Sequence, residues 1–481
     1  MSAEAILPTA SPTAEPGWRE LLAEGRASVL ALILLGCWVV AADSLVTATI
    51  MPSVGAALDG FAWFGWAAAG FMTGLVVAGA AAGWLAERIG LRAAMMLAGA
   101  AFALGCGLSA AAPDILLFLA GRVLQGGAAG LICCLIYVAL ALLFPGRFLP
   151  RVFALCTSVW GVATFVGPLL GGLFADAGLW RWIFWLFAGQ ALLFTAASFV
   201  LIPPRMGSDA EGRLPAMPLV LLALGIAAIA TAGVVAAAGF AVLLAGAGVF
   251  MLAGALAADR ARGNGLVPRR SGAFPLGTAY LLYFTTTAAG TAFALYAPAM
   301  LQHRWGLSAL EAGYLVAIEA LAWTAASLSV AGAAEAWRSR LIVAGAGSIL
   351  AGALGVTLLM DGGSLAAIGM SAALLGGGFG LSYSFLGQRV IGSFGAAERA
   401  RGSSAIGTVR NAGGALGAAL AGIAANGAGF ANGLEESNFH LVAWGAFGSS
   451  VPFALIGLGG AILLVRARPQ AGLATGISAS A

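Results

Sequence analysis

The sequence has no lysine, few charged residues and only two histidines. All 23 basic residues are arginine, and charged residues make up 9% of the chain, against about 25% in soluble domains. Hydrophobic residues make up 61%, which predicts an integral membrane protein. The two histidines, His303 and His440, fall in predicted loops without a nucleophile or metal-ligand set, so we expect neither an enzyme nor a bound metal or cofactor. A P-loop motif is also missing, which argues against ATP as the energy source.

Cysteines are few and lie within apolar runs, so they indicate neither a metal site nor an extracellular disulfide framework. They are Cys37, Cys106, Cys133, Cys134 and Cys156. Residues 1–26 are polar, carry acids and lack a cleavage pattern, so they do not read as a signal peptide. We expect residues 1–27 and 467–481 to form cytoplasmic tails.

Long apolar runs dominate the remainder of the chain. A helix needs roughly 20 apolar residues to cross the hydrocarbon layer of a membrane, and we count fourteen such runs. An all-α membrane protein with fourteen spans is therefore expected. The predicted spans are 28–50, 61–85, 91–111, 115–143, 149–174, 181–202, 217–237, 239–258, 274–299, 309–333, 340–359, 363–387, 402–425 and 442–465.

The arginines predict the orientation of these spans, because cytoplasmic loops are enriched in positive charge. With the N-terminus inside, 19 of the 23 arginines fall in cytoplasmic segments, and only Arg181 and Arg304 fall outside. An error in the number of spans would scramble this bias partway along the chain. We therefore expect both termini in the cytoplasm and a location in the inner (cytoplasmic) membrane.

The spacing of the loops predicts an internal repeat. The longest cytoplasmic connections, 203–216 and 259–273, bracket two spans that contain almost no polar side chains. The chain then divides into a six-span bundle (28–203), a linker with two extra spans (204–273) and a second six-span bundle (274–466). Two six-span halves are typical of transporters built by repetition.

Five motifs, in the right order and on the right spans, resemble the major facilitator superfamily and its fourteen-span drug:proton antiporter branch. "GWLAERIGLR" (83–92) resembles the loop signature after the second span, and "GRVLQGGAAG" (121–130) the R-x-x-Q-G pattern of the fourth. "WGVATFVGPLLGGLFAD" (160–176) is similar to the fifth-span G-P-x-x-G-G signature of proton-coupled exporters. "ADSLVTATIMP" (42–52) and "VRNAGGALGAA" (409–419) resemble the first and the penultimate spans. The resemblance implies two six-helix bundles with two additional helices between them.

The loop motif suggests a cytoplasmic gate. Its residues are Gly83, Glu87, Arg88, Gly90 and Arg92, with Glu87 where aspartate is usual. Charged pairs at the membrane edge can join the ends of the two bundles when the inside is closed. The alternative is that these charges only set the topology. The matching loop of the second half, 332–341, keeps only fragments of the motif.

The fifth-span motif combines glycines with a proline in an apolar helix. Gly167 and Gly171 share one helical face, which Gly161 and Gly172 widen, and Pro168 bends the helix. Small residues let membrane helices approach closely. In the resembled fold this helix meets the other half, so we expect a smooth surface on which the halves rock. Ordinary helix packing is the alternative.

Four charges fall well inside predicted spans, where each costs at least ~2.5 kcal/mol and is a functional candidate by default. Asp43 and Arg122 both lie roughly 10–13 Å below the outer surface by helical rise, so they can meet if the first and fourth spans are neighbours. Asp43 is the first candidate for proton coupling, and a fixed ion pair is the alternative. Glu319 either pairs with Arg410 or faces the cavity alone as a second protonation or cation site. Arg410 and Asn411 more simply fix helix packing or the gate.

The expected cavity is aromatic and weakly polar, on the spans that face the centre in the resembled fold. Such a lining suits bulky hydrophobic or amphipathic molecules better than sugars or phosphates. Simple packing is the alternative for each side chain. The candidates are Trp38, Ser44, Thr47, Gln125, Tyr137, Tyr280, Tyr283, Thr286, Ser382, Tyr383 and Phe385.

These features predict a secondary active exporter of drug-like compounds, driven by inward proton flow through alternating access. Its expected partners are protons, a small hydrophobic or amphipathic substrate and the lipid bilayer, with no nucleic acid, and it is expected to be a monomer. A lipid exporter of the same fold, an uptake carrier or facilitator for a specific small molecule, and a non-transporting receptor or scaffold are the alternatives.

Overall fold

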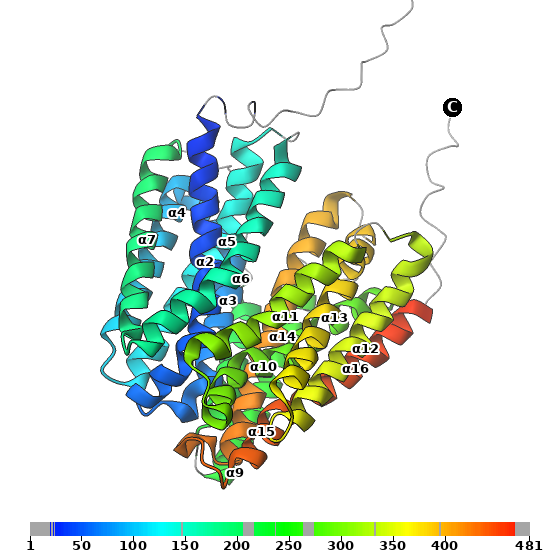
Figure 1. The fold of residues 1–481 in the computed structure, drawn as a ribbon. Helices are drawn as coiled ribbons and strands as arrows, with labels where there is room; N and C mark the ends of the chain where they lie inside the picture. The colour runs from blue at the N-terminus through cyan, green and yellow to red at the C-terminus, as the bar shows by residue number, and fades with distance from the viewer. Residues whose placement is uncertain are drawn as a thin grey trace, which may run out of the picture.

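The computed structural model describes residues 20, 23, 25–145, 148–204, 216–235, 237–262, 274–330, 333–393 and 396–466. The predicted tails therefore lie almost wholly outside the described residues, as does much of the predicted linker. The described part of the chain consists of helices and their connections, as Figure 1 shows. This confirms the predicted all-α class.

A helix overlaps each of the fourteen predicted spans. The last span is formed by two helices that meet at Ser449. The helices are α2 (Arg26–Ala57), α3 (Phe64–Ile89), α4 (Leu91–Ala111), α5 (Ile115–Leu143), α6 (Leu149–Asp176), α7 (Trp180–Leu201), α8 (Ala216–Ala232), α9 (Ala238–Arg262), α10 (Leu276–Trp305), α11 (Ala309–Val330), α12 (Glu335–Leu359), α13 (Leu365–Gly392), α14 (Ala396–Gly427), α15 (Phe439–Gly448) and α16 (Ser450–Arg466), with short 3-10 turns η1 (Phe61–Trp63) and η4 (Phe430–Asn432).

The described helices are long and apolar enough for a multi-pass membrane protein. Eleven candidate spans meet both conditions among the described residues, the last of them formed by α15 and α16 together. The helix α8, with 17 residues, is shorter. Fourteen spans are supported when each helix is matched to a predicted span by position. About eleven are supported when helix length and hydropathy are the criteria.

Helices α2 to α7, called the N-half below, pack against one another. Glycine allows the closest approach: a Cβ at Gly126 of α5 would lie 2.0 Å from the Phe71 carbonyl oxygen of α3. Gly130, one turn further along α5, meets the Leu75 carbonyl in the same way, at 2.2 Å. The glycines of the "GRVLQGGAAG" motif thus bring the α3 and α5 backbones together.

Helices α10 to α16, called the C-half below, form the second group. Here α11 and α13 approach through Gly376, where a Cβ would lie 1.7 Å from the Glu319 carbonyl oxygen. Gly380, one turn later, meets the Trp323 carbonyl oxygen at 2.4 Å. The packing fixes the backbone on either side of the Glu319 side chain.

The two halves meet mainly through α3 with α14 and α6 with α11. Their close backbone approaches, such as Gly172 to Leu310 and Gly65 to Ala418, lie at the end where α2 ends and α3 begins, which we call the closed end. In Figure 1 the ribbons of the halves diverge toward the other end, where α2 begins and α16 finishes; we call this the open end. The sequence predicts the closed end to be outer and the open end to be cytoplasmic.

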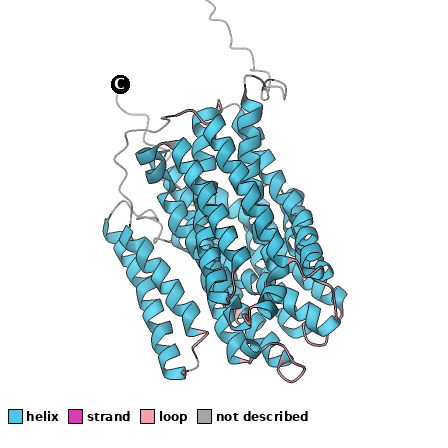
Figure 2. Ribbon diagram, turned by 90° about the vertical axis from the view of Figure 1, so that its left-hand side faces the viewer, coloured by secondary structure: helices cyan, strands magenta, loops and turns pink. Residues whose placement is uncertain are grey.

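The two extra helices, α8 and α9, form a hairpin at one edge of the molecule, on the left of Figure 2. Helix α8 contacts both α3 and α14. The Trp66 indole donates to Thr231 Oγ1 at 3.1 Å, and Asn426 Nδ2 donates to the Gly233 and Ala62 carbonyl oxygens at 3.0 and 2.6 Å. The hairpin is therefore fastened to both halves near the closed end.

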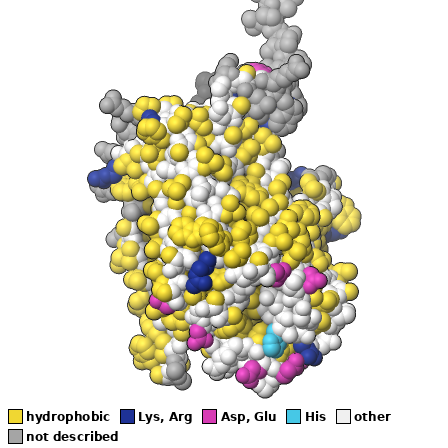
Figure 3. Space-filling view, turned by 60° about the vertical axis from the view of Figure 1, so that its left-hand side comes forward, with side chains coloured by type: hydrophobic (Ala, Val, Ile, Leu, Met, Phe, Trp, Pro, Cys, Tyr) yellow, Lys and Arg dark blue, Asp and Glu magenta, His cyan; other side chains and the backbone are white. Residues whose placement is uncertain are grey.

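The flank of the molecule is apolar, as Figure 3 shows by the yellow side chains that cover much of one face. Large hydrophobic side chains are exposed on several helices, among them Val200 of α7 at 75% and Phe250 and Val242 of α9 at 79% and 72%. Water would not favour such exposure over several helices. These side chains are therefore assigned to the lipid-facing surface.

Candidate functional site

Asp43 of α2 and Arg122 of α5 form a buried ion pair. Arg122 Nη1 donates to Asp43 Oδ2 at 3.0 Å and to Oδ1 at 3.2 Å. The two side chains are 0% and 4% exposed. The equal depth expected from the helical rise is what brings them together. The pair places opposite charges in the interior of the N-half, where a charge without a partner is costly.

Gln125 extends this pair into a small network. Its side-chain oxygen accepts a hydrogen bond from Arg122, and its Nε2 donates to Cys106 Sγ at 3.0 Å. The Arg122 guanidinium also lies 4.5 Å from the ring centre of Phe71. Gln125 is fully buried, so in this structure it lies inside the bundle and not on the cavity wall where the sequence placed it. Its position one helical turn after Arg122 is the reason.

Glu319 and Arg410 do not pair. Within the described residues neither side chain has a hydrogen-bond or ion-pair partner. Glu319 Oε1 lies beside Gly290 of α10, 3.5 Å from where a Cβ would stand. Of the two arrangements that the sequence left open, the structure favours Glu319 without an arginine beside it. A carboxyl group in this position can hold a proton or a cation.

A cluster of tyrosines and threonines lies in the C-half between α10 and α13. The Tyr383 hydroxyl is hydrogen-bonded to Thr286 Oγ1 at 3.0 Å and to Thr287 Oγ1 at 2.8 Å. The Tyr283 hydroxyl donates to the Tyr383 carbonyl oxygen at 3.0 Å, and the two rings are 4.7 Å apart. The structure thus gathers three predicted cavity residues into one place, where they are largely buried against each other.

Two further aromatic rings join this cluster from beside Glu319. Trp323, one turn after Glu319 on α11, stacks on Phe379 at 5.0 Å and meets Tyr383 edge-on at 5.5 Å. Phe379 also lies against Gly290, as Glu319 does. The sequence analysis did not select Trp323 or Phe379. Their spacing from Glu319 on α11 and from Tyr383 on α13, one helical turn in each case, is the signal that could have found them.

The remaining C-half candidates are packed rather than open. Tyr280 is 5% exposed and Phe385 3%. Ser382 donates to the Gly378 carbonyl within its own helix at 2.8 Å. In this conformation these three side chains belong to the packing of the C-half, which was the alternative weighed for them.

The N-half candidates on α2 are divided. Trp38 Nε1 donates to Gln190 of α7 at 3.0 Å, and Ser44 donates to the Val40 carbonyl in its own helix. The Thr47 hydroxyl oxygen is buried and has no hydrogen-bond partner among the described residues. Trp38 therefore ties α2 to α7, and Thr47 keeps an unused hydrogen-bonding group inside the bundle.

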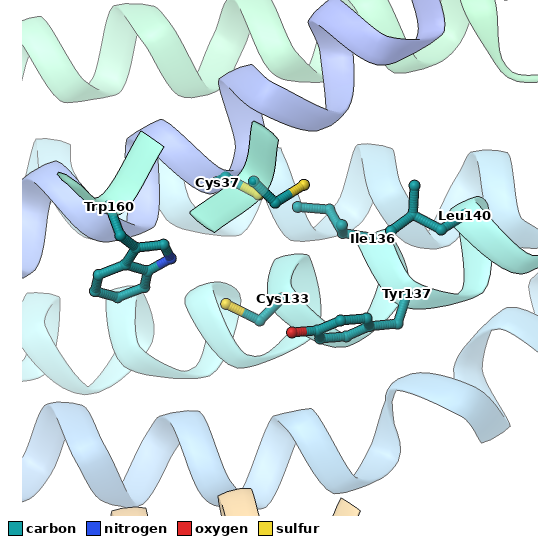
Figure 4. Close-up of a pocket in the computed structure, with 7 residues that line it drawn as sticks. Cys37, Cys133, Ile136, Tyr137, Leu140 and Trp160 are labelled. Carbon is teal, nitrogen blue, oxygen red and sulfur yellow. The ribbon is translucent and has the colours of Figure 1, made fainter. Parts of the chain in front are cut away.

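Tyr137, the remaining N-half candidate, lines a pocket of about 150 Å³ on α2, α5 and α6. Figure 4 shows Tyr137 and Cys133 beside the pocket, with Trp160 toward one end and Leu140 toward the other. Tyr137 is 60% exposed and Trp160 45%. The pocket is lined by Cys37, Cys133, Ile136, Tyr137, Leu140, Cys156 and Trp160.

The glycine–proline stretch of α6 lies against α2 and α11. A Cβ at Gly167 would lie 2.7 Å from Leu45 Cβ, and one at Gly171 would lie 3.0 Å from Thr49 Cβ. At Gly172 the Cβ would lie 2.4 Å from Leu310 Cα in the other half. Gly161 differs, because open space surrounds it. The close face therefore begins at Gly167 and does not include Gly161 in this conformation.

Pro168 lies inside α6 and reaches the other half. A Cβ at Gly313 of α11 would lie 3.0 Å from Pro168 Cβ. The proline and the glycines after it thus form the surface on which α11 rests at the closed end.

The closed end is filled by aromatic rings from both halves. Phe64 lies 5.0 Å from Phe430 and 6.0 Å from Tyr296, and Phe61 meets Phe430 edge-on at 5.5 Å. Phe64, Tyr296 and Phe430 are fully buried. Phe64, Tyr296 and Phe430 are more than a hundred positions apart, so no spacing in the sequence predicts that they meet.

Asp176, the last residue of α6, is a second feature of the closed end that the sequence analysis missed. Its Oδ1 accepts from the Ala309 backbone N–H at 2.8 Å and its Oδ2 from the Leu310 N–H at 3.4 Å. These amides begin α11 in the other half. Asp176 could have been selected from the sequence, because it is an acid at the end of a span expected to meet the second half.

The predicted gate residues lie at the open end, in the last turns of α3 and the first turn of α4, and Arg88 and Arg92 contact their own half. Arg92 lies 4.1 Å from the Phe199 ring centre, and Arg88 5.4 Å from that of Trp84. Gly90 has a φ of +84°, which favours glycine. Gly83 is exposed, Glu87 is half-buried, and Asn411, on α14 next to Arg410, is half-buried. With the halves apart here, the predicted contacts between span ends remain a prediction.

Comparison with known proteins identifies the architecture. The family model of the Major Facilitator Superfamily matches residues 33–418. The chain belongs to the major facilitator superfamily. Members of this superfamily are transporters and not enzymes. Among the described residues, no group of three or more His, Cys, Asp or Glu side chains is placed to hold a metal ion.

Relatives of this major facilitator include a multidrug-efflux protein. The chain is 32% identical over 405 residues to the "Probable multidrug-efflux transporter" of Mycobacterium tuberculosis (strain H37Rv), covering 80% of this chain and 83% of that protein. Among solved structures, a D-xylose–proton symporter superposes with a TM-score of 0.66 at 15% identity, covering 93% of this chain and 98% of that one. A nucleoside transporter superposes at 0.62 and 12% identity, covering 92% and 98%. These structures share the fold.

Proposed function

We propose that this major facilitator is a proton-coupled exporter of hydrophobic or amphipathic compounds that works by alternating access. The observation that carries the proposal is the buried Asp43–Arg122 pair, in a chain whose relative is named for multidrug efflux. A carboxylate that is wholly shielded from solvent and held by one guanidinium is a site where a single proton changes the local charge balance.

The proton acts through Arg122. When Asp43 is ionised, Arg122 donates to both of its oxygens. Protonation of Asp43 removes that charge and leaves Arg122 buried with Gln125 as its remaining side-chain acceptor. The pair joins α2 to α5, so the proton alters how these two helices are held. A ligand can shift a conformational equilibrium only by binding one state better than the other, and protonation at Asp43 supplies that difference.

The substrate lies between the halves, in our proposal. Tyr137 and Trp160 offer exposed aromatic area from the N-half, and we place Glu319 and Arg410 of the C-half on the opposite side of the substrate. Few polar groups surrounded by aromatic rings suit amphipathic molecules. Glu319, without a cationic partner and beside Trp323 and Phe379, adds preference for compounds with a positive charge.

The orientation and location that we propose are those predicted from the sequence. With the termini in the cytoplasm, the open end faces inward and the closed end outward, which is a state that takes substrate from the cytoplasm or inner leaflet. We place the protein in the inner membrane as a monomer. The division into residues 28–203, 204–273 and 274–466 stays part of this proposal.

Reconstitution tests the coupling. Purified protein in vesicles with an imposed pH gradient should show proton movement when an amphipathic dye is added, and Asp43→Asn should abolish both proton movement and uphill dye transport. Asp114→Asn is the matched control, because Asp114 is an exposed cap of α5. Dye transport by Asp43→Asn with the wild-type pH dependence would overturn the coupling. A parallel panel of fluorescent lipids separates drug export from lipid export.

A further inference from the structure

Three of the five cysteines come together from separate parts of the chain. Cys37 of α2, Cys133 of α5 and Cys156 of α6 line the same pocket, and each is partly exposed. Cys106, by contrast, is buried beside Gln125. Packing needs explain a single small apolar cysteine in a membrane helix. They do not by themselves explain why thiols from three helices meet around one accessible space.

Cys37 and Cys156 lie on two helices, α2 and α6, that pack directly against each other. Both line the same pocket. The other close pair in sequence, Cys133 and Cys134, consists of adjacent residues on α5, and adjacent helical side chains do not face one another. Because they lie on neighbouring helices and line one pocket, Cys37 and Cys156 are the pair of thiols we assign to a common ligand.

The rest of the pocket selects an aromatic ligand. Tyr137 and Trp160 present exposed rings, and Ile136 and Leu140 complete an apolar lining. Trp160 and Leu140 lie toward opposite ends of the pocket in Figure 4, with Cys133 between them. A flat apolar group bonded to a thiophilic atom matches both features: the ring lies against Trp160 or Tyr137, and the atom reaches the sulfurs.

We propose that Cys37 and Cys156 form a dithiol binding site for trivalent arylarsenicals and similar soft, aromatic thiophiles, in the pocket lined by α2, α5 and α6 of the N-half. In water such a compound is an aryl-arsenic dihydroxide. Two S–H bonds and two As–OH bonds break, two As–S bonds form, and two water molecules leave. Arsenic and sulfur keep their oxidation states, so no oxidant or reductant takes part. The site does not depend on proton coupling at Asp43.

Phenylarsine oxide is the probe. The purified full-length protein is treated with it, washed with an excess of a monothiol, and weighed intact by mass spectrometry. A single As–S bond exchanges with the monothiol, whereas the two-sulfur ring resists it. Wild type and the controls Cys134→Ser and Cys106→Ser should keep the arsenical through the wash. Cys37→Ser and Cys156→Ser should each lose it, and a competing dithiol should remove it from wild type.

A second measurement, the melting temperature with and without the probe, distinguishes a loss of binding from misfolding of the variant. Phenylarsine oxide should raise the melting temperature of the wild type and of Cys134→Ser in detergent, and should leave those of Cys37→Ser and Cys156→Ser unchanged. Cys37→Ala and Cys156→Ala, which remove the thiol without adding a hydroxyl, should behave like the serine variants. Retention of the arsenical by Cys37→Ser, or its loss only in Cys133→Ser and Cys134→Ser, would overturn the assignment.

Discussion

The carboxylate of Asp176, at the end of α6 in the N-half, accepts a hydrogen bond of 2.8 Å from the backbone N–H of Ala309 at the start of α11 in the C-half. Helix α11 already carries its own cap, since Ser308 and Glu311 bond to each other's backbone amides. The backbone amides of Ala309 and Leu310 are not used by this cap, and they donate instead to Asp176 of the other half. An acid near a helix N-terminus is also favoured by the helix dipole.

Asp176→Ala should therefore weaken the closed end. Loss of an N-terminal cap costs about 0.5–2 kcal/mol, which is a shift of about 2- to 30-fold toward separation of the halves at this end. Spin labels at Leu179 and Leu441, placed after the native cysteines are replaced by serine, measure that separation. Asp114→Ala is the control, because Asp114 caps α5 within the N-half. Equal distance distributions in Asp176→Ala and wild type would contradict the assignment.

Gly172→Ala should act at the same place by a steric route. The new Cβ would lie 2.4 Å from Leu310 Cα, so α6 and α11 must move apart and the closed state is disfavoured. We expect a wider separation of the spin labels and slower dye transport in a folded protein. Gly161→Ala, on the same helix with open space around it, should leave both unchanged. The same response from the two variants would show that helix propensity, and not the contact, is responsible.

Arg122→Gln should destabilise the protein strongly, because it leaves Asp43 buried without its partner. Breaking one member of a buried pair costs about 3–5 kcal/mol. Thermal unfolding in detergent should show a large loss for Arg122→Gln, most of which the double variant with Asp43→Asn restores. If the losses of the two single variants simply add in the double variant, the two side chains are not coupled.

Glu319→Gln should reduce transport of cationic compounds more than that of neutral ones. Glu319 faces no cation among the described residues, and the rings of Trp323 and Phe379 lie near it, so its charge is available to a substrate. Rates for a matched pair of dyes, one cationic and one neutral, measure the preference. Glu311→Gln, on the same helix in its exposed cap, provides the comparison. An equal loss for both dyes would point instead to proton transfer at Glu319.

Asn426→Ala should loosen the α8–α9 hairpin. The Asn426 amide donates to Ala62 in the N-half and to Gly233 beyond α8, so its loss frees three parts of the chain. Each lost hydrogen bond lowers the stability by about 0.5–1.5 kcal/mol. Hydrogen exchange should increase in α8 and η1 together. Asn438→Ala, whose side-chain amide bonds to Gly429, Gly433 and Glu435 in its own loop, should leave α8 unaffected.

The sequence by itself determined the class of protein, the approximate positions of the spans and the equal depth of Asp43 and Arg122. These follow from local or one-dimensional rules: a run of apolar residues of membrane length, and a helical rise that gives two charges equal depth. The same rules found the glycine face of α6 from Gly167 onward, because helical spacing fixes which glycines share a side.

Only the tertiary structure decided what those faces touch. Gln125, predicted to line the cavity, lies in the interior beside Arg122. Gly161 shares its helix with Gly172 yet has open space around it. The separation of Glu319 from Arg410, the Asp176 contact with α11 and the meeting of Cys37 with Cys156 join residues far apart in the chain. Such contacts depend on how the two bundles dock and on how each helix is rotated about its own axis. In lipid that rotation is set by packing against neighbouring helices, which cannot be read from the sequence alone.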